Sequence, residues 1–255
     1  MQAQHMPVEL ISATRNTCDS CCTRKNCLVN RFDDRIVRAL SRVMRQPRPM
    51  EKGDRLYIQG DRFYSLYLIR SGAFKSCITD DTGDRQITGF HFPAEIIGLD
   101  GVESGRHLYE IEALETSSVC VIPFGQFEQI SRHNNGDLYR HLVCAVSGSA
   151  FKESQLLMVL GRLHAEQRLA SFLIDTSMRM RDRGESSREF NLSMARQDIA
   201  NYLGLAIETV SRLFKRFEEE GLISAEGRHV RIVDTIGLHS IVAGERRFSG
   251  LRNIA

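Results

Sequence analysis

The chain has 255 residues, a formal net charge of +2, 42% hydrophobic residues and 26% charged residues. This balance is typical of a folded soluble protein; it excludes a disordered chain, and no apolar run is long enough to span a bilayer. The N-terminal residues lack the basic and apolar regions of a secretory signal, so we expect a cytoplasmic protein. Because the net charge is nearly zero, any contact with nucleic acid must come from a local basic face.

Cysteine is the most informative part of the composition. The chain has seven cysteines, and four of them fall within ten residues. The clustered thiols are Cys18, Cys21, Cys22 and Cys27, and the scattered ones are Cys77, Cys120 and Cys144. An odd number of cysteines without a secretory signal argues against a disulfide framework. The cluster therefore predicts metal or redox chemistry.

The apolar pattern divides the chain into four parts. Residues 1–30 form an irregular cysteine-rich segment. Residues 31–136 begin with a helical pattern and continue with short alternating runs separated by Gly-containing turns, as in a small barrel or jelly roll. Residues 137–163 form one long helix, and residues 164–255 contain further helices and a hairpin.

The long helix has apolar residues at the three–four spacing of a coiled-coil seam. The seam residues are Val143, Val146, Ala150, Glu153, Leu157 and Leu160. A helix packed into a core is the alternative, but the weak positions Ala150 and Glu153 favour a reversible homodimer. In such a dimer, two Glu153 carboxylates ~6 Å apart at an effective dielectric of ~20 would repel by roughly 3 kcal/mol. We therefore expect Glu153 to oppose dimer formation, unless its side chain turns outward to water.

Residues 193–217 have the pattern of a helix-turn-helix. Ser193 is expected to cap the first helix, and Gly204 supplies the tight turn. The second helix is expected to bury Val210, Leu213, Phe214 and Phe217 and to expose Glu208, Ser211, Arg212 and Lys215. A recognition helix needs this division into an apolar face and a polar face. A turn at Gly227, between two short apolar runs, predicts a wing.

The exposed residues of the second helix suit the reading of bases. Arg212 can donate two hydrogen bonds to guanine, Glu208 can accept one from cytosine, and Ser211 suits thymine or the backbone. Lys215 and Arg216 are expected to contact phosphates, which position the protein without reading sequence. The alternative is an ordinary helical pair with a solvated charged face.

Four segments together resemble the Crp/Fnr superfamily, and more narrowly its oxygen-responsive FNR/ANR branch. They are residues 69–72 (IRSG), 86–91 (QITGFH), 114–124 (LETSSVCVIPF) and 208–212 (ETVSR). The resemblance implies an α+β fold: an N-terminal β-roll of the cyclic-nucleotide-binding jelly-roll type, a long dimerisation helix and a C-terminal winged helix-turn-helix. It also implies a homodimer that activates or represses genes at palindromes like TTGAT-N4-ATCAA. By the same resemblance, the turn at residues 80–85 would contact RNA polymerase; an ordinary solvated hairpin tip is the alternative.

The same resemblance implies that Cys18, Cys21, Cys27 and Cys120 hold a [4Fe-4S] cluster that oxygen degrades. Four thiolates suit such a cluster, but they equally suit a structural zinc ion. Cys22 could replace Cys21 as a ligand, or it could be a spare thiol. The two are not expected to bind together, because adjacent side chains in an extended segment point apart. A zinc-based or thiol-based regulator of the same fold is therefore the alternative, and a thiol redox enzyme is a distant one.

A cyclic nucleotide is not expected as a ligand. Receptors for these ligands hold the ribose and phosphate with a Gly-Glu pair and a downstream Arg-Ser or Arg-Thr. In residues 97–109, Leu99 stands where the glutamate is expected, and no Arg-Ser follows. Arg106 could contact a phosphate, but a solvated loop residue is the simpler interpretation. We also expect no enzymatic activity.

Overall fold

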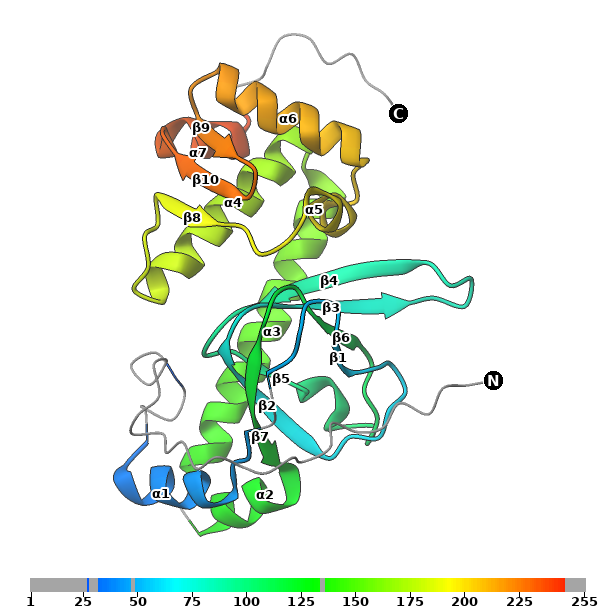
Figure 1. The fold of residues 1–255 in the computed structure, drawn as a ribbon, viewed down its shortest axis with the longest axis vertical. Coiled ribbons are helices and arrows are strands. Elements are labelled where there is room, and N and C mark those ends of the chain that lie inside the picture. Colours follow the sequence, from blue (N-terminus) through cyan, green and yellow to red (C-terminus); the bar gives the residue numbers. More distant parts are fainter. Residues whose placement is uncertain (1–26, 28–31, 47–48, 134–135, 246–255) are drawn as a thin grey trace. The chain divides into compact units, whose positions relative to one another are not determined.

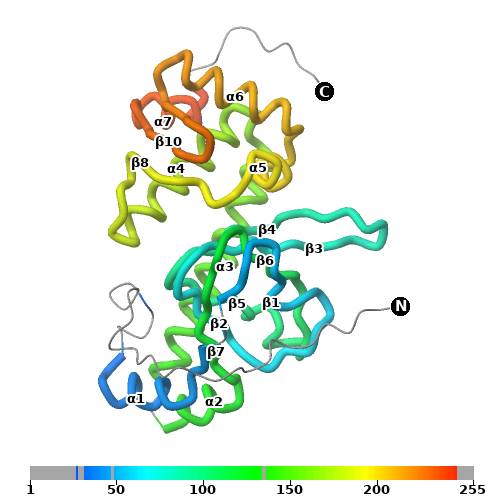
Figure 2. The backbone as a smooth tube through the Cα atoms, viewed as in Figure 1, coloured from blue at the N-terminus to red at the C-terminus, as the bar shows by residue number. Residues whose placement is uncertain are grey.

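A computed structural model describes residues 27, 32–46, 49–133 and 136–245 of the chain. The chain divides into two compact units, Met1–Phe151 and Lys152–Ala255, whose backbone is drawn in Figures 1 and 2. Within the described ranges, none of the helices combines the length and apolar character that a membrane crossing requires. The finer division into four segments remains a prediction.

The first unit is built on two antiparallel sheets (Figure 1). The four-stranded sheet has the order β1 (Arg55–Tyr57), β6 (Glu110–Ala113), β3 (Phe74–Thr79) and β4 (Arg85–His91). The three-stranded sheet has the order β5 (Ile96–Ile97), β2 (Ser65–Ser71) and β7 (Ser118–Pro123). A short 3-10 helix, η3 (Leu99–Gly101), follows β5.

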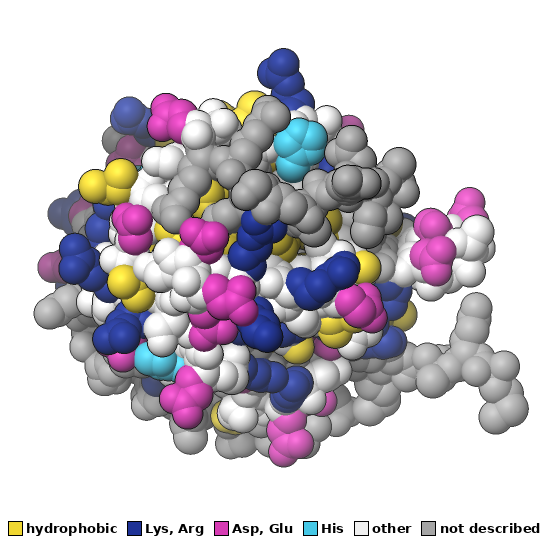
Figure 3. Space-filling model, turned by 90° about the horizontal axis from the view of Figure 1, so that it is seen from above, with side chains coloured by type: hydrophobic (Ala, Val, Ile, Leu, Met, Phe, Trp, Pro, Cys, Tyr) yellow, Lys and Arg dark blue, Asp and Glu magenta, His cyan; other side chains and the backbone are white. Residues whose placement is uncertain are grey.

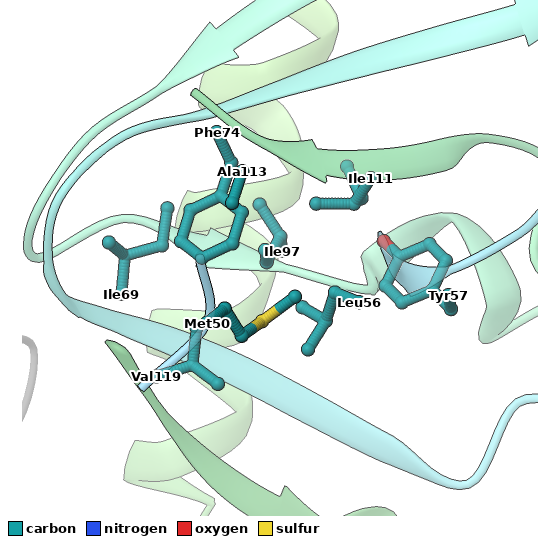
Figure 4. Close-up of a cluster of buried hydrophobic side chains, with 9 residues drawn as sticks. All are labelled: Met50, Leu56, Tyr57, Ile69, Phe74, Ile97, Ile111, Ala113 and Val119. Atoms are coloured by element: carbon teal, nitrogen blue, oxygen red, sulfur yellow. The ribbon is translucent and has the colours of Figure 1, made fainter. Parts of the chain in front are cut away.

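Alternate side chains of β2 and β7 face opposite sides of the three-stranded sheet, as the pleat of a strand requires. Ile69 and Val119 lie on one side, in a core that also contains Phe74 of the other sheet (Figure 4). Leu68 and Cys120, which pair across the two strands, pack on the other side in a separate buried cluster. The register of this strand pair therefore decides which face Cys120 occupies.

Helices cover the second side of this sheet. These are α1 (Asp34–Val43), α2 (Phe124–Arg132) and the beginning of α3 (Asp137–Arg162). Ile36 of α1, Phe127 of α2 and Leu138 of α3 are buried in one cluster with Leu66 of β2. The Asp33 carboxylate begins α1 by accepting hydrogen bonds from the first-turn backbone at 2.9 Å.

The described part of the second unit contains the end of α3, a three-stranded sheet and four further helices. The helices are α4 (Ala165–Asp182), α5 (Arg196–Leu203), α6 (Ile207–Glu219) and α7 (Thr235–Ala243), and the sheet order is β8 (Glu189–Asn191), β10 (His229–Ile232), β9 (Ile223–Glu226). Gly204, with φ +61, ends α5 and turns the chain into α6. Gly227, with φ +60, forms the turn between β9 and β10. This is a helix-turn-helix with a wing.

Arg168 of α4 connects the ends of two helices. Its guanidinium donates to the carbonyl oxygens of Leu160 at 2.7 Å and Leu203 at 3.0 Å, and its Nε donates to Leu163 at 2.9 Å. The last carbonyls of a helix have no partner within it and carry partial negative charge, so a cation suits them. The end of α3 and the end of α5 are therefore held by one side chain.

The predicted α+β fold class is confirmed: a β-roll, a long helix and a winged helix-turn-helix follow one another along the chain. The expected cap at Ser193 is wrong, because α5 begins at Arg196. The Asp198 carboxylate instead accepts from the backbone N–H of Ala195 at 2.9 Å. Helix α2 and strand β8 were not predicted.

The turn at Gly72 allows a sharp test of the packing of the β-roll. Gly72 has φ +78, and a Cβ atom there would lie 2.7 Å from the Cα atom of Ser117. Gly83 is a matched control, because it has φ +91 with open space around it. We expect Gly83→Ala to lower the free energy of unfolding by about 1–3 kcal/mol through backbone strain. Gly72→Ala should cost about 1–3 kcal/mol more through overpacking, measured by urea denaturation; equal losses would contradict this close approach.

Candidate DNA-binding and metal-binding sites

Helix α6 has the predicted division into two faces. Its buried residues are Val210, Leu213, Phe214 and Phe217, whereas Glu208, Ser211, Arg212 and Lys215 are exposed. Glu208 lies in the first turn, so the polar face begins at the N-terminal end of the helix. The division into faces is thus confirmed, and the assignment of bases to individual residues remains a prediction.

The cations of α6 differ in their surroundings. The side chain of Lys215 is 79% exposed, and its Nζ lies 3.9 Å from Glu219 on the same helix. The side chain of Arg216 is 22% exposed, and its Nη1 lies 3.4 Å from the Glu166 carboxylate of α4. Lys215 is therefore available to a phosphate, whereas Arg216 would have to give up this ion pair to reach one.

Two arginines connect the turn of the wing to the start of α5 and to the segment just before it. Arg196 donates to the carbonyl of Gly227 at 3.2 Å, and its guanidinium lies 3.5 Å from the ring centroid of Phe214 on α6. Arg228 donates in the opposite direction, to the carbonyl of Ser193 at 3.2 Å. Burial lowers the pKa of Arg196, and the charge of Glu218 opposes that shift. Sequence analysis missed Arg196, because nothing local marks a pairing with the wing.

Positive charge does not dominate the face drawn in Figure 3. Lys and Arg side chains are interspersed there with Asp and Glu side chains. This agrees with a formal net charge of +2 for the whole chain. Attraction to a polyanion must therefore come from a local set of cations.

Two of the four predicted metal ligands come together in the first unit. Cys27 and Cys120 are 8% and 6% exposed and belong to one buried cluster with Val37 and Leu68. Cys18 and Cys21, like Cys22, lie outside the described residues. Among the described residues, no three His, Cys, Asp or Glu side chains gather as a metal site would require. The structure thus juxtaposes the two thiols that come from distant parts of the chain.

The remaining two cysteines lie elsewhere. Cys77 of β3 is buried, and burial raises the pKa of its thiol. Cys144 is exposed on α3. Neither belongs to the cluster that contains Cys27 and Cys120.

The interior of the β-roll contains a buried polar group that sequence analysis did not predict. Both N–H groups of Leu108 and Tyr109 donate to Asp100, at 2.8 and 3.2 Å. The other carboxylate oxygen of Asp100 accepts from the Tyr57 hydroxyl at 3.3 Å and lies 3.4 Å from Nδ1 of His107. The rings of Tyr57 and His107 are stacked, with their centroids 3.6 Å apart. Asp100 therefore closes the loop that follows η3 onto the strands.

This arrangement perturbs two pKa values. Burial, and then the charge of Asp100, raise the pKa of Tyr57 well above its usual value. Burial alone would raise the pKa of Asp100, but the bonds with His107 and the two backbone N–H groups outweigh it, so that pKa is lowered. The exposed Arg106 instead donates to the carbonyl of Gly60 at 2.7 Å.

The predicted seam of α3 is largely exposed in the single chain. Val143, Val146 and Leu157 are 62%, 47% and 72% exposed. Ala150 and Glu153 are also exposed, and Leu160 is half-buried. These exposed apolar side chains suit an interface, and the role of Glu153 in opposing it remains a prediction.

Comparison with known families matches both units. Residues 47–134 match the cyclic nucleotide-binding domain family, and residues 167–241 match the Crp-like helix-turn-helix domain family. The chain is 41% identical over 238 residues to the transcriptional activator protein Anr of Pseudomonas protegens, which covers 93% of this chain and 97% of that protein. It is 37% identical over 230 residues to the fumarate and nitrate reduction regulatory protein of Escherichia coli K12, which covers 90% and 91%.

Among solved structures, FixK2 from Bradyrhizobium japonicum has a TM-score of 0.70 and 28% identity, covering 78% of this chain and 96% of that one. The relatives named above are transcription regulators, which supports a regulator rather than an enzyme.

The buried carboxylate of Asp100 predicts a dependence of stability on pH. Asp100→Asn should lower the free energy of unfolding by about 1–3 kcal/mol at pH 7, because it removes a charged hydrogen-bond acceptor. Since the pKa of Asp100 is lowered in the folded state, its contribution is complete above about pH 4 and is lost as pH falls further. The difference between variant and wild type should therefore narrow towards pH 3 in urea denaturation.

The exposed Asp81 supplies the control for this measurement. Asp81→Asn should change stability by less than about 0.5 kcal/mol. A constant difference between Asp100→Asn and wild type from pH 7 to pH 3 would show that the charge of Asp100 does not matter.

Proposed function

This chain belongs to the Crp/Fnr family of transcription regulators, and we propose that it is an oxygen-responsive member that holds a [4Fe-4S] cluster. The ligands proposed are Cys18, Cys21, Cys27 and Cys120. The loaded homodimer would bind DNA without oxygen, and cluster loss in oxygen would end that binding.

The observation that carries this proposal is the burial of Cys27 and Cys120 in one apolar cluster. A shielded pair of thiols from distant segments is the chemistry that a thiolate-bound metal centre requires. Cys18 and Cys21 precede Cys27 by nine and six residues in the sequence, so the length of the chain would allow both to reach the same place. The bound cluster would supply the sensitivity to oxygen. The four cysteines would join the N-terminal segment to β7.

The relatives support the same proposal. One is named for the reduction of fumarate and nitrate. A regulator of such reductions is one that an oxygen-sensitive group would suit. Zinc bound by the same four cysteines is the competing occupant, because it accepts four thiolates in a similar site.

The proposed DNA site is a palindrome like TTGAT-N4-ATCAA, read by α6 of each subunit of a dimer formed along α3. Arg212 would read the guanine of each half-site, Glu208 the paired cytosine, and Ser211 a neighbouring thymine or the backbone. Lys215 would contact a phosphate, as would Arg216 if it left Glu166. The protein would activate or repress according to where the site lies relative to a promoter, and it would work in the cytoplasm.

Two further features bear on partners. The exposed hairpin turn between β3 and β4 is ordered by Asp80, whose carboxylate accepts from the N–H groups of Thr82 and Asp84 at 2.9 and 3.0 Å. We propose this turn as a contact for RNA polymerase. The contact between Asp100 and His107 is buried in the first unit, which supports the proposal that no cyclic nucleotide binds there.

Exchange of single cysteines tests the metal centre. Purified without oxygen and reconstituted with iron and sulfide, the wild type should be brown with a broad absorbance band in the blue. Cys120→Ser should lose that band and anaerobic DNA binding. Cys77→Ser is the matched control, because Cys77 is also buried on a strand of the β-roll, and it should retain both.

Metal analysis of the same samples separates the alternatives. If the wild type is colourless and contains zinc, the four cysteines hold a zinc ion and not a cluster. Iron and sulfide retained by Cys120→Ser would show that the four-ligand assignment is wrong.

Exchange of single cations tests the DNA reading. Arg212→Ala should weaken binding by about 1–3 kcal/mol and relax the preference at the guanine of each half-site. Lys215→Ala should weaken all sequences alike and reduce the salt dependence, because a phosphate contact carries no base information. Selection of binding sites from random DNA measures both effects. If the Arg212→Ala protein still selects the same guanine, another residue reads that base.

A further inference from the structure

Backbone pairing places Gln46 beside Cys120. Arg45 and Val121 exchange both of their backbone hydrogen bonds, N–H of Arg45 to Val121 at 3.0 Å and N–H of Val121 to Arg45 at 2.8 Å. This is an antiparallel bridge, in which the next residue of one segment lies opposite the preceding residue of the other. Gln46 is therefore the direct neighbour of Cys120, although the two are far apart in the sequence.

The side chain of Gln46 is directed at the sulfur. Its Nε2 donates to Sγ of Cys120 at 3.8 Å. Its Oε1 accepts from Nη1 of Arg70 at 2.9 Å. A guanidinium has donors only, so it must face the carbonyl end of the amide, which leaves the NH₂ end towards the sulfur. Arg70 thus fixes which end of Gln46 meets Cys120.

Strand β2 supplies Arg70. Arg70 lies two residues after Leu68 on β2, and Leu68 pairs with Cys120. The pairing of β2 with β7 is irregular between Ile69 and Ser71, so the position of Arg70 follows from its hydrogen bond to Gln46. Arg70, Gln46 and Cys120 therefore form a chain of hydrogen bonds that ends in the cluster where Cys27 is buried.

We propose that Gln46 is a positioning residue for the metal centre: it donates a hydrogen bond to the thiolate of Cys120 and makes the bound cluster harder to oxidise. This inference rests on the proposed function. Hydrogen bonds to the sulfurs help to set the reduction potentials of iron–sulfur centres. A donor draws electron density from the thiolate, so the centre gives up an electron less easily. Gln46 and Arg70 would thereby set how fast the regulator responds to oxygen.

The experiment compares full-length proteins that are reconstituted without oxygen and then mixed with aerated buffer. Gln46→Glu keeps an acceptor for Arg70 but has no N–H group, and Gln46→Leu removes the donor without adding charge. In both, the visible absorbance should decay about tenfold faster than in the wild type, at the low end of the effects of outer-shell partners on metal sites. The midpoint reduction potential should also fall in both variants.

Gln59→Glu is the matched control. Gln59 is another β-roll glutamine whose side-chain oxygen accepts a hydrogen bond, from the N–H of Thr79 at 3.0 Å. The substitution adds the same charge without touching a cysteine, so the decay rate and the potential should match the wild type. A third variant, Arg70→Met, removes the hydrogen bond that orients the amide of Gln46 and should accelerate the decay by a smaller factor.

The outcomes separate this inference from the function on which it rests. A colourless wild type refutes the proposed function and the role of Gln46 together. A loaded wild type whose Gln46→Glu and Gln46→Leu variants decay at the wild-type rate refutes the role of Gln46 alone. If the decay is faster in Gln46→Glu but not in Gln46→Leu, the added charge causes the effect, and the proposed role of the hydrogen bond is refuted. Should either variant fail to fold, Arg70→Met decides by the same two measurements.

Discussion

The antiparallel ladder between β2 and β7 sorts the side chains of both strands onto two faces of one sheet. On one face, Ile69 and Val119 complete the core of the β-roll; on the other, Leu68 and Cys120 meet α1. A shift of one residue would exchange these two sets, because the side-chain period of a strand is two. The burial of Cys120 beside Cys27 depends on this register. The position of the candidate metal site therefore depends on how β2 and β7 pair.

The second unit depends on arginines that donate to backbone carbonyls. Arg168 joins the ends of α3 and α5, and Arg196 and Arg228 join the wing to the start of α5. Arginine suits this role because its donors point in several directions from one plane and it stays charged. These bonds involve the ends of α3 and α5 and the wing, so none of them uses the exposed residues Glu208, Ser211 and Arg212 of α6.

Patterns that repeat within a segment predicted much of the fold. The apolar spacing of α6 predicted its buried and exposed faces. The seam of α3 remains a prediction, because the off-seam Phe151 and Met158 are exposed as well. The prediction that Ser193 caps α5 was wrong. The helix begins two residues later than that prediction requires, where the Asp198 carboxylate accepts from the N–H of Ala195. Helix α2 was missed because it is short and follows a strand directly.

Contacts between distant residues in the candidate sites could not be predicted from local sequence patterns. The clustered cysteines stand out in the sequence, but the pairing of Arg45 with Val121 that brings Gln46 to Cys120 does not. The same holds for Arg196 and Gly227, which lie on different elements. Contacts of this kind follow from strand register and helix packing, and only a three-dimensional structure reveals them.

The two crossed arginines of the wing have a consequence for the thermodynamics of DNA binding. Ordering a loop costs roughly 1–2 kcal/mol of conformational entropy per residue, and a loop that becomes ordered only on binding subtracts that cost from affinity. Here Arg196 and Arg228 already fix the turn at Gly227 in the free protein. Folding has therefore met this entropic cost in advance, so any contact that the wing makes with DNA would carry no further cost for ordering the turn.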